Sequence, residues 1–112
     1  MTISGTDITM IRGDTETLTV TCQLEDGTAR PFEAGDPVIL TVGWPVGREV
    51  LQKTVTAFTE DGAAVITLSH ADTNELQAGI YRYDVQLTAG DGTVKTIIPP
   101  SRFGLEGDVT RE

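Results

Sequence analysis

Three features of this chain have side chains suited to chemistry or recognition: the tripeptide Arg12-Gly13-Asp14, the single cysteine Cys22 and the single histidine His70. Nucleophilic catalysis requires a nucleophile, a base and an orienting group that converge on one pocket. Cys22 lies in the middle of an expected strand with its side chain inward, so pairing it with His70 would require that strand to open. We therefore expect no catalytic residues and no enzymatic activity, and we interpret Cys22 as a small buried hydrophobic residue.

The sequence predicts no metal site and no cofactor. A lone cysteine excludes both an intrachain disulfide and a cysteine-based zinc site. The acidic pairs Glu25-Asp26 and Glu60-Asp61 belong to turns, where aspartate is favoured for local hydrogen bonds. No loop supplies the alternating oxygen ligands that calcium requires, and the glycines are spread among turns instead of forming a phosphate-binding loop.

Arg12-Gly13-Asp14 is the tripeptide that animal adhesion receptors read at the tip of a protruding loop. Here it lies between an apolar run and a strand that is established by Leu18, which leaves few residues for a protrusion. A tight bend or a strand switch fits better, in which Gly13 supplies the conformation and Asp14 or Thr15 caps nearby amides. We therefore interpret Gly13 and Asp14 as structural residues.

Length and charge narrow the class of protein. The 112 residues fit a single domain, 1–112, that is large enough to bury a core without disulfides. With 17 acidic and 8 scattered basic residues the net charge is -9, so nucleic acid and anionic membranes are disfavoured as partners. No apolar stretch is long enough to span a bilayer, and the N-terminus does not resemble a signal peptide.

Alternation of apolar and polar residues predicts an all-β antiparallel sandwich of seven or eight strands. The expected strands, the clearest first, are 15–24, 79–87 and 38–44, followed by 8–11, 48–58, 63–68, 93–98 and 102–106. The buried face of the strand at 38–44 ends at Trp44, which we interpret as a core residue. Asp-Gly pairs at 26–27, 61–62 and 91–92 predict turns, and the last two join consecutive strands as hairpins.

Helical patterning is limited to one short turn near residues 72–77, with Asp72 or Thr73 as its N-cap. The residues "NELQAGIYRYDV" around it place a helical turn before a strand that carries Gly-x-Tyr.

In immunoglobulin-like sandwiches the tyrosine of this arrangement, called a tyrosine corner, hydrogen-bonds back to the turn. We assign Tyr81 as the corner residue, Leu76 as a plug of the core and Gly79 as the end of the turn, and we expect an immunoglobulin-like β-sandwich.

A carbohydrate-binding module is the alternative hypothesis, because many such modules are β-sandwiches with exposed aromatic platforms. Aromatic residues make up 5% of the chain, and Tyr81 and Tyr83 are expected to point inward. The aromatic residues left to form a platform are Trp44, Phe32, Phe58 and Phe103, and they form no obvious stripe. A host-surface glycan is therefore a less favoured partner than another protein.

Five segments carry a resemblance to a known family: "IRGDT" at 11–15, "DG" at 26–27, "TNELQAGIYRYDVQL" at 73–87, "GDGTVKTI" at 90–97 and "FGLEGDVT" at 103–110. In this order and spacing they resemble the small immunoglobulin-like β-domain of bacteriophage and prophage tail and baseplate proteins, of the kind that begins the upper baseplate protein of some phages of Gram-positive hosts. Family members usually have glycine just before the last Phe-containing strand, where this chain has Pro99-Pro100-Ser101-Arg102. The path of the last strand is therefore an open question.

The resemblance implies a non-enzymatic structural module of the virion that docks on other tail or baseplate subunits. Such domains often form threefold or sixfold assemblies, so a homo-oligomer is among the partners that the resemblance implies. It also implies a location in the virion tail or baseplate, and in the bacterial cytoplasm during assembly.

Overall fold

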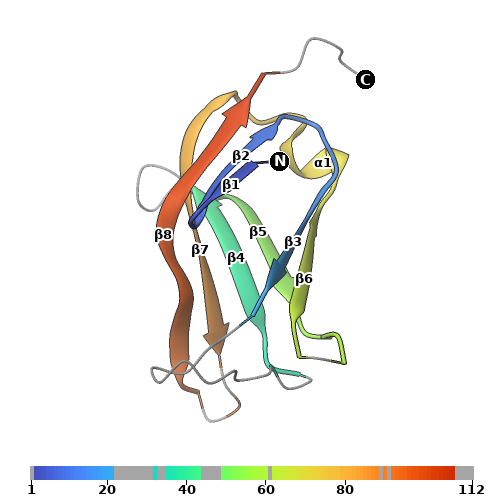
Figure 1. Cartoon of the computed structure of the whole chain (residues 1–112), viewed down its shortest axis with the longest axis vertical. Coiled ribbons are helices and arrows are strands. Elements are labelled where there is room, and N and C mark those ends of the chain that lie inside the picture. The colour runs from blue at the N-terminus through green and yellow to red at the C-terminus, as the bar shows by residue number, and fades with distance from the viewer. Residues whose placement is uncertain are drawn as a thin grey trace.

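The computed structural model describes residues 2–21, 32, 35–43, 49–60, 62–88, 90 and 92–107. These residues form an all-β sandwich with one short helix, α1 (His70–Thr73) (Figure 1). The strands are β1 (Thr2–Ser4), β2 (Asp7–Ile11), β3 (Glu16–Val20), β4 (Val38–Gly43), β5 (Glu49–Val55), β6 (Ala64–Leu68), β7 (Gly79–Thr88) and β8 (Val94–Glu106).

The strands belong to two sheets of unequal size. The larger sheet has six strands in the order β1-β2-β8-β7-β4-β5, and the smaller contains β3 and β6. Figure 1 shows β3 and β6 side by side, apart from β8, β7 and β4. The two sheets form an all-β sandwich, and the predicted fold class is confirmed. One pair departs from the antiparallel prediction, because β2 and β8 are parallel, with Ile8 opposite Phe103.

The last two predicted strands, 93–98 and 102–106, are a single strand, β8, that continues through Pro99 and Pro100. Proline lacks the N–H of a sheet ladder and is found in strands at edges or bulges. It is tolerated here because β2 pairs with β8 only from Phe103 onward, so residues 94–100 form an edge within the described sheet. The β7–β8 register also shifts in this region.

Two further features of the chain path differ from the sequence predictions. β1 was not predicted, because three residues are too few to show a period; it joins β2 through the two-residue turn Gly5-Thr6, in which Gly5 has a φ of 60°. The segment after β5 leads to β6, which lies in the other sheet. The hairpin predicted at 61–62 is therefore wrong, and this segment is a crossover, whereas β7 and β8 form the hairpin predicted at 91–92.

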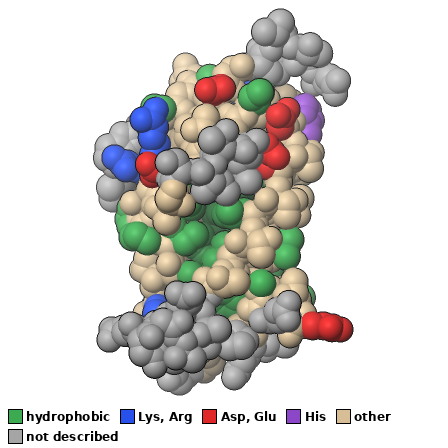
Figure 2. Space-filling model, in the orientation of Figure 1, with side chains coloured by type: hydrophobic (Ala, Val, Ile, Leu, Met, Phe, Trp, Pro, Cys, Tyr) green, Lys and Arg blue, Asp and Glu red, His purple; other side chains and the backbone are tan. Residues whose placement is uncertain are grey.

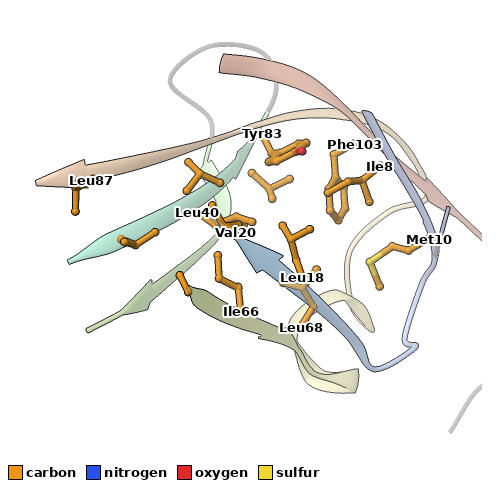
Figure 3. Close-up of a cluster of buried hydrophobic side chains, with 14 of the residues drawn as sticks. Ile8, Met10, Leu18, Val20, Leu40, Ile66, Leu68, Tyr83, Leu87 and Phe103 are labelled. Carbon is orange, nitrogen blue, oxygen red and sulfur yellow. The ribbon is translucent and has the colours of Figure 1, made fainter. Parts of the chain in front are cut away.

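The core lies between the two sheets (Figure 3). Its buried side chains alternate along the strands, as the sequence pattern requires, and fully burying a valine, leucine, isoleucine, phenylalanine or methionine side chain stabilises the fold by about 1.5–3 kcal/mol. They are Ile8, Met10, Leu18, Val20, Phe32, Val38, Leu40, Val42, Ala64, Ile66, Leu68, Tyr83, Val85, Leu87, Phe103 and Leu105. The predicted core residues Cys22 and Trp44 lie outside the described residues.

Residues 69–81 form the turn and the tyrosine corner. The Tyr81 hydroxyl donates a hydrogen bond to the Gln77 carbonyl at 2.6 Å, and Leu76 packs against the core. The helix itself starts earlier than predicted: its N-cap is Ser69, it ends at Thr73, and Gly79 begins β7.

Asp72, one of the two predicted N-caps, lies at the third helical position. From there its carboxylate accepts a hydrogen bond from the Ser69 N–H at 2.7 Å. Asp72 therefore supplies an acceptor for a backbone donor at the start of the helix, although it lies within the first turn.

We predict that Tyr81→Phe lowers the free energy of unfolding by about 1 kcal/mol, the typical net value of one intramolecular hydrogen bond. The measurement is chemical denaturation followed by circular dichroism. The matched control is Gln77→Ala, which keeps the accepting backbone carbonyl and should change stability by less than about 0.5 kcal/mol. Equal stability of Tyr81→Phe and the native chain would show that the corner hydrogen bond contributes nothing.

Candidate functional site

Arg12-Gly13-Asp14 forms the corner at which the chain leaves the larger sheet for the smaller one. β2 ends at Ile11, and β3 begins in the other sheet at Glu16. The Asp14 N–H donates to the Ile11 carbonyl at 3.1 Å, and Gly13 has a φ of 86°. A turn with this bond and a positive φ at its third residue is type II, which favours glycine at that position. The tripeptide is therefore a strand switch.

Two side chains of α1 form hydrogen bonds with the backbone N–H and carbonyl of Gly13. The Gly13 N–H donates to Thr73 Oγ1 at 2.8 Å, and Thr73 is fully buried. On the other side, His70 Nδ1 lies 2.7 Å from the Gly13 carbonyl oxygen. Because a carbonyl only accepts hydrogen bonds, this contact requires the proton on Nδ1. The lone histidine thus has a structural contact, which links α1 to the corner.

Arg12 is also held within the domain. Its backbone N–H donates to the Glu106 carbonyl at 2.8 Å, and its guanidinium donates to the Leu76 carbonyl at 3.2 Å. An arginine whose side chain is bound to the Leu76 carbonyl is not presented at the tip of a protruding loop, as adhesion receptors require. Asp14 is exposed, and the hydrogen bond described for it comes from its backbone N–H. We use the name corner cluster for Arg12, Gly13, His70, Thr73 and Leu76.

Asp72 connects α1 to β5. Its Oδ2 atom lies 3.0 Å from Lys53 Nζ and also accepts the Ser69 N–H. Partial burial raises the pKa of the Asp72 carboxyl, but the hydrogen bonds from Ser69 and Lys53, together with the charge of Lys53, outweigh burial. The pKa of Asp72 is therefore lower than its ordinary value.

The pKa of a second carboxylate is shifted in the opposite direction. Asp84 is on the outer face of β7, and burial followed by the negative charge of Glu49 raises the pKa of its carboxyl. Asp84 and His70 lie on different elements, and the ring of His70 contacts Gly13. In the described part of the chain no three side chains of His, Cys, Asp or Glu form a group able to hold a metal ion.

The described aromatic side chains lie in the core or pack against it. Phe32 and Phe103, which sequence analysis left free to be exposed, are buried, and Phe58 packs partly buried against the core, with its ring centroid 5.2 Å from that of Phe32. Tyr83 is buried and its hydroxyl donates to the Thr6 carbonyl. Trp44 lies outside the described residues. Among the described side chains we therefore find no exposed aromatic platform of the kind that binds sugar rings.

Unpaired strand edges are the remaining surfaces suited to recognition. Residues 94–98 of β8 pair with β7 on one side and have no described strand on the other. β5 is the last strand of the larger sheet, at the end away from β1. It lies beside β6, and Lys53 links it to α1. None of the described helices is long and apolar enough to cross a membrane.

We predict that Gly13→Ala lowers the free energy of unfolding by about 1–2 kcal/mol, because an L-residue is strained at positive φ. The new Cβ would lie 3.4 Å from His70 Nδ1, which is close to an ordinary van der Waals contact, so the expected loss comes from the backbone strain. Thermal and chemical denaturation provide the measurement. In the matched control, Gly90→Ala, φ is not in the left-handed region and the Cβ meets only Asp36 Oδ1 at 3.9 Å. Equal effects of the two variants would contradict the assigned role of Gly13.

We also predict opposite pH dependences for two aspartates. Because the pKa of Asp72 is lowered from 3.8 on folding, its contribution to stability is present above that pH and is lost as the pH falls through the folded-state value. Asp72→Asn should therefore be destabilising at neutral pH and approach the native chain in acid. The pKa of Asp84 is raised, so its ionisation costs stability as the pH rises above 3.8.

Asp84→Asn consequently should gain stability relative to the native chain between acid and neutral pH. Urea denaturation of the native chain and both variants across this range measures the two slopes. Parallel curves for Asp72→Asn and Asp84→Asn would contradict the assigned environments of these carboxylates.

Comparison with protein families and with curated proteins identifies no relative of this chain. No protein-family model matches the chain, and no curated protein matches it. The function proposed for this chain therefore rests on the sequence resemblance and on the open strand edge of β8.

Proposed function

We propose that this domain is a non-enzymatic assembly module of a bacteriophage or prophage tail or baseplate, which binds other virion subunits through an open strand edge. Support for the viral setting comes from the resemblance of segments such as 73–87 and 103–110 to tail and baseplate domains. Support for assembly comes from one observation about β8, namely that only Phe103 to Leu105 are paired on both sides.

The open edge at residues 94–98 offers backbone N–H and C=O groups to another extended chain. Thr96 lies opposite Gln86 of β7, and the side away from β7 has no described strand. Another protein that adds a strand there completes these hydrogen bonds. Val94, which is 58% exposed, supplies apolar area beside this backbone row.

Charge and proline limit what can pair with this edge. The stretch from Thr93 to Leu105 contains no acidic residue, in a chain with net charge -9, so an approaching acidic subunit meets less repulsion here than elsewhere. Pro99 and Pro100 end the open stretch, because proline cannot donate to a ladder. A short segment with a defined end favours one register over indefinite edge-to-edge growth.

The test is co-purification with the proteins encoded beside this one, by size-exclusion chromatography with light scattering, followed by titration of any complex. We expect a stable complex, and we expect Thr96→Lys to weaken it by about tenfold, since lysine on an edge strand opposes pairing. The matched control is Gln86→Lys, which places the same charge on the same face, one strand further in.

A protein that stays monomeric at high concentration and binds none of its neighbours contradicts the assembly function. A complex that Gln86→Lys weakens as much as Thr96→Lys contradicts the assignment of the β8 edge. A complex that only Thr96→Lys weakens supports both.

A further inference from the structure

The chain contains two lysines, and each lies on the inner face of a strand that borders the larger sheet. Lys53 of β5 is opposite Leu40, and Lys95 of β8 is opposite Leu87. Both leucines are buried in the core. Because residues directly opposite on neighbouring strands share one face of a sheet, both lysines are on the face that points toward the core.

The two lysines differ in what surrounds their ammonium groups. Lys53 Nζ lies 3.0 Å from Asp72 Oδ2, so α1 supplies a counter-charge for β5. Lys95 is partly buried, and among the residues that the structure describes no carboxylate forms an ion pair with it. Asp36, an acid near the same end of the sheet, comes just before β4, so β7 separates it from Lys95. The open edge of β8 therefore has an inward-facing positive charge without a described counter-charge.

Apolar side chains continue along the same face of β8 beyond Lys95. Between the rows of Gln86 and Val85, β8 contains one extra residue, Ile97. Ile97 and its neighbour Ile98 both pack against the core, and both are only partly buried. Figure 2 shows hydrophobic side chains exposed beside the middle of β8. A strand added at this edge thus meets a positive charge first and apolar surface next to it.

We propose that the open edge of β8 binds an extended partner-protein segment that places aspartate or glutamate opposite Lys95 and a β-branched apolar residue beside Ile97 or Ile98. Opposite charges that face each other across a ladder stabilise a sheet. An apolar or basic residue opposite Lys95 leaves its ammonium group without a counter-charge, so Lys95 selects the partner. The inference rests on the assembly function and names the chemistry of the bound strand.

Other occupants fit this edge less well. Antiparallel pairing of two copies through residues 94–98 would bring both Lys95 side chains to one face of a short ladder. Inward-pointing charges are among the devices that prevent edge-to-edge association of identical chains, and the net charge of -9 on each copy adds repulsion. A single lysine also neutralises too few phosphates to hold nucleic acid.

The test uses three synthetic peptides and the isotope-labelled full chain, with binding followed by NMR at physiological salt. The peptides are Gly-Thr-Val-Thr-X-Thr-Val-Thr-Gly, in which X is glutamate, glutamine or lysine. The sequence is symmetric about X, so it presents the same pattern in parallel and antiparallel pairing. We expect the glutamate peptide to shift the amides of residues 94–98. It should bind about threefold more tightly than the glutamine peptide and about tenfold more tightly than the lysine peptide.

Lys95→Glu should reverse this order, so that the lysine peptide binds most tightly. Such a reversal separates a change of specificity from a loss of folding, since an unfolded variant would bind none of the peptides. Arg102→Glu is the matched control, because it makes the same charge change on β8 beside the part that β2 already pairs. It should leave the order of the three peptides unchanged.

A glutamate peptide that does not bind, or that binds no more tightly than the glutamine peptide, overturns the proposal. Retention of the native order by Lys95→Glu overturns it as well. A reversal produced equally by Arg102→Glu would show that overall charge, and not Lys95, selects the peptide, and this also overturns the proposal.

The same variants separate this inference from the assembly function. A native complex with neighbouring subunits that Thr96→Lys weakens and Lys95→Glu leaves intact contradicts the role of Lys95 and preserves the assembly function. The absence of any subunit complex, with the peptide order and its reversal intact, contradicts the assembly function and preserves the chemistry of the edge.

Discussion

The rest of the structure depends on the two hydrogen bonds that join Gly13 to the α1 turn. The chain passes between the sheets near residues 12–15, and passes between them again through α1, on the way from β6 to β7. Thr73 and His70 bind the backbone of Gly13, so these two crossings are fastened to each other. Both strands of the smaller sheet are thereby anchored at one end. A two-stranded sheet is marginally stable alone, and this anchor together with the core below it holds the sheet in place.

The path of the N-terminal residues decides which part of the larger sheet is left open. β2 runs beside β8 only from Phe103 to Glu106, and at Gly5 the chain folds back so that β1 pairs with β2. The first half of β8 therefore has one described strand neighbour instead of two. Pro99 and Pro100 are compatible with this half because they need no partner on the open side. The same local topology explains both the prolines within a strand and the edge to which a function is assigned.

The alternation of apolar and polar residues was sufficient to predict the strands in which buried and exposed side chains alternate strictly. Leu18 and Val20, for example, were placed correctly because their neighbours face solvent. The same alternation does not distinguish parallel from antiparallel pairing, so the parallel β2–β8 ladder was not predicted. The N-cap was misplaced because Asp72 and Ser69 act together, and either type of residue caps a helix. The bonds from α1 to Gly13 join residues that are 57 and 60 positions apart, a distance over which no local pattern operates.

Electrostatics favours the open edge of β8 as the place where a partner binds. A chain with net charge -9 repels most acidic partners over most of its surface, so specific association is favoured where the local charge is neutral or positive. β8 is such a place, because Lys95 and Arg102 are two of its residues and its one acid, Glu106, is at its end. The proximity of Arg102 to Arg82 depends on the β7–β8 register, which neither residue reveals in the sequence. The open edge of β8 has a different origin, because β2 pairs with β8 only from Phe103 onward and the β7–β8 register shifts do not change which strands flank β8.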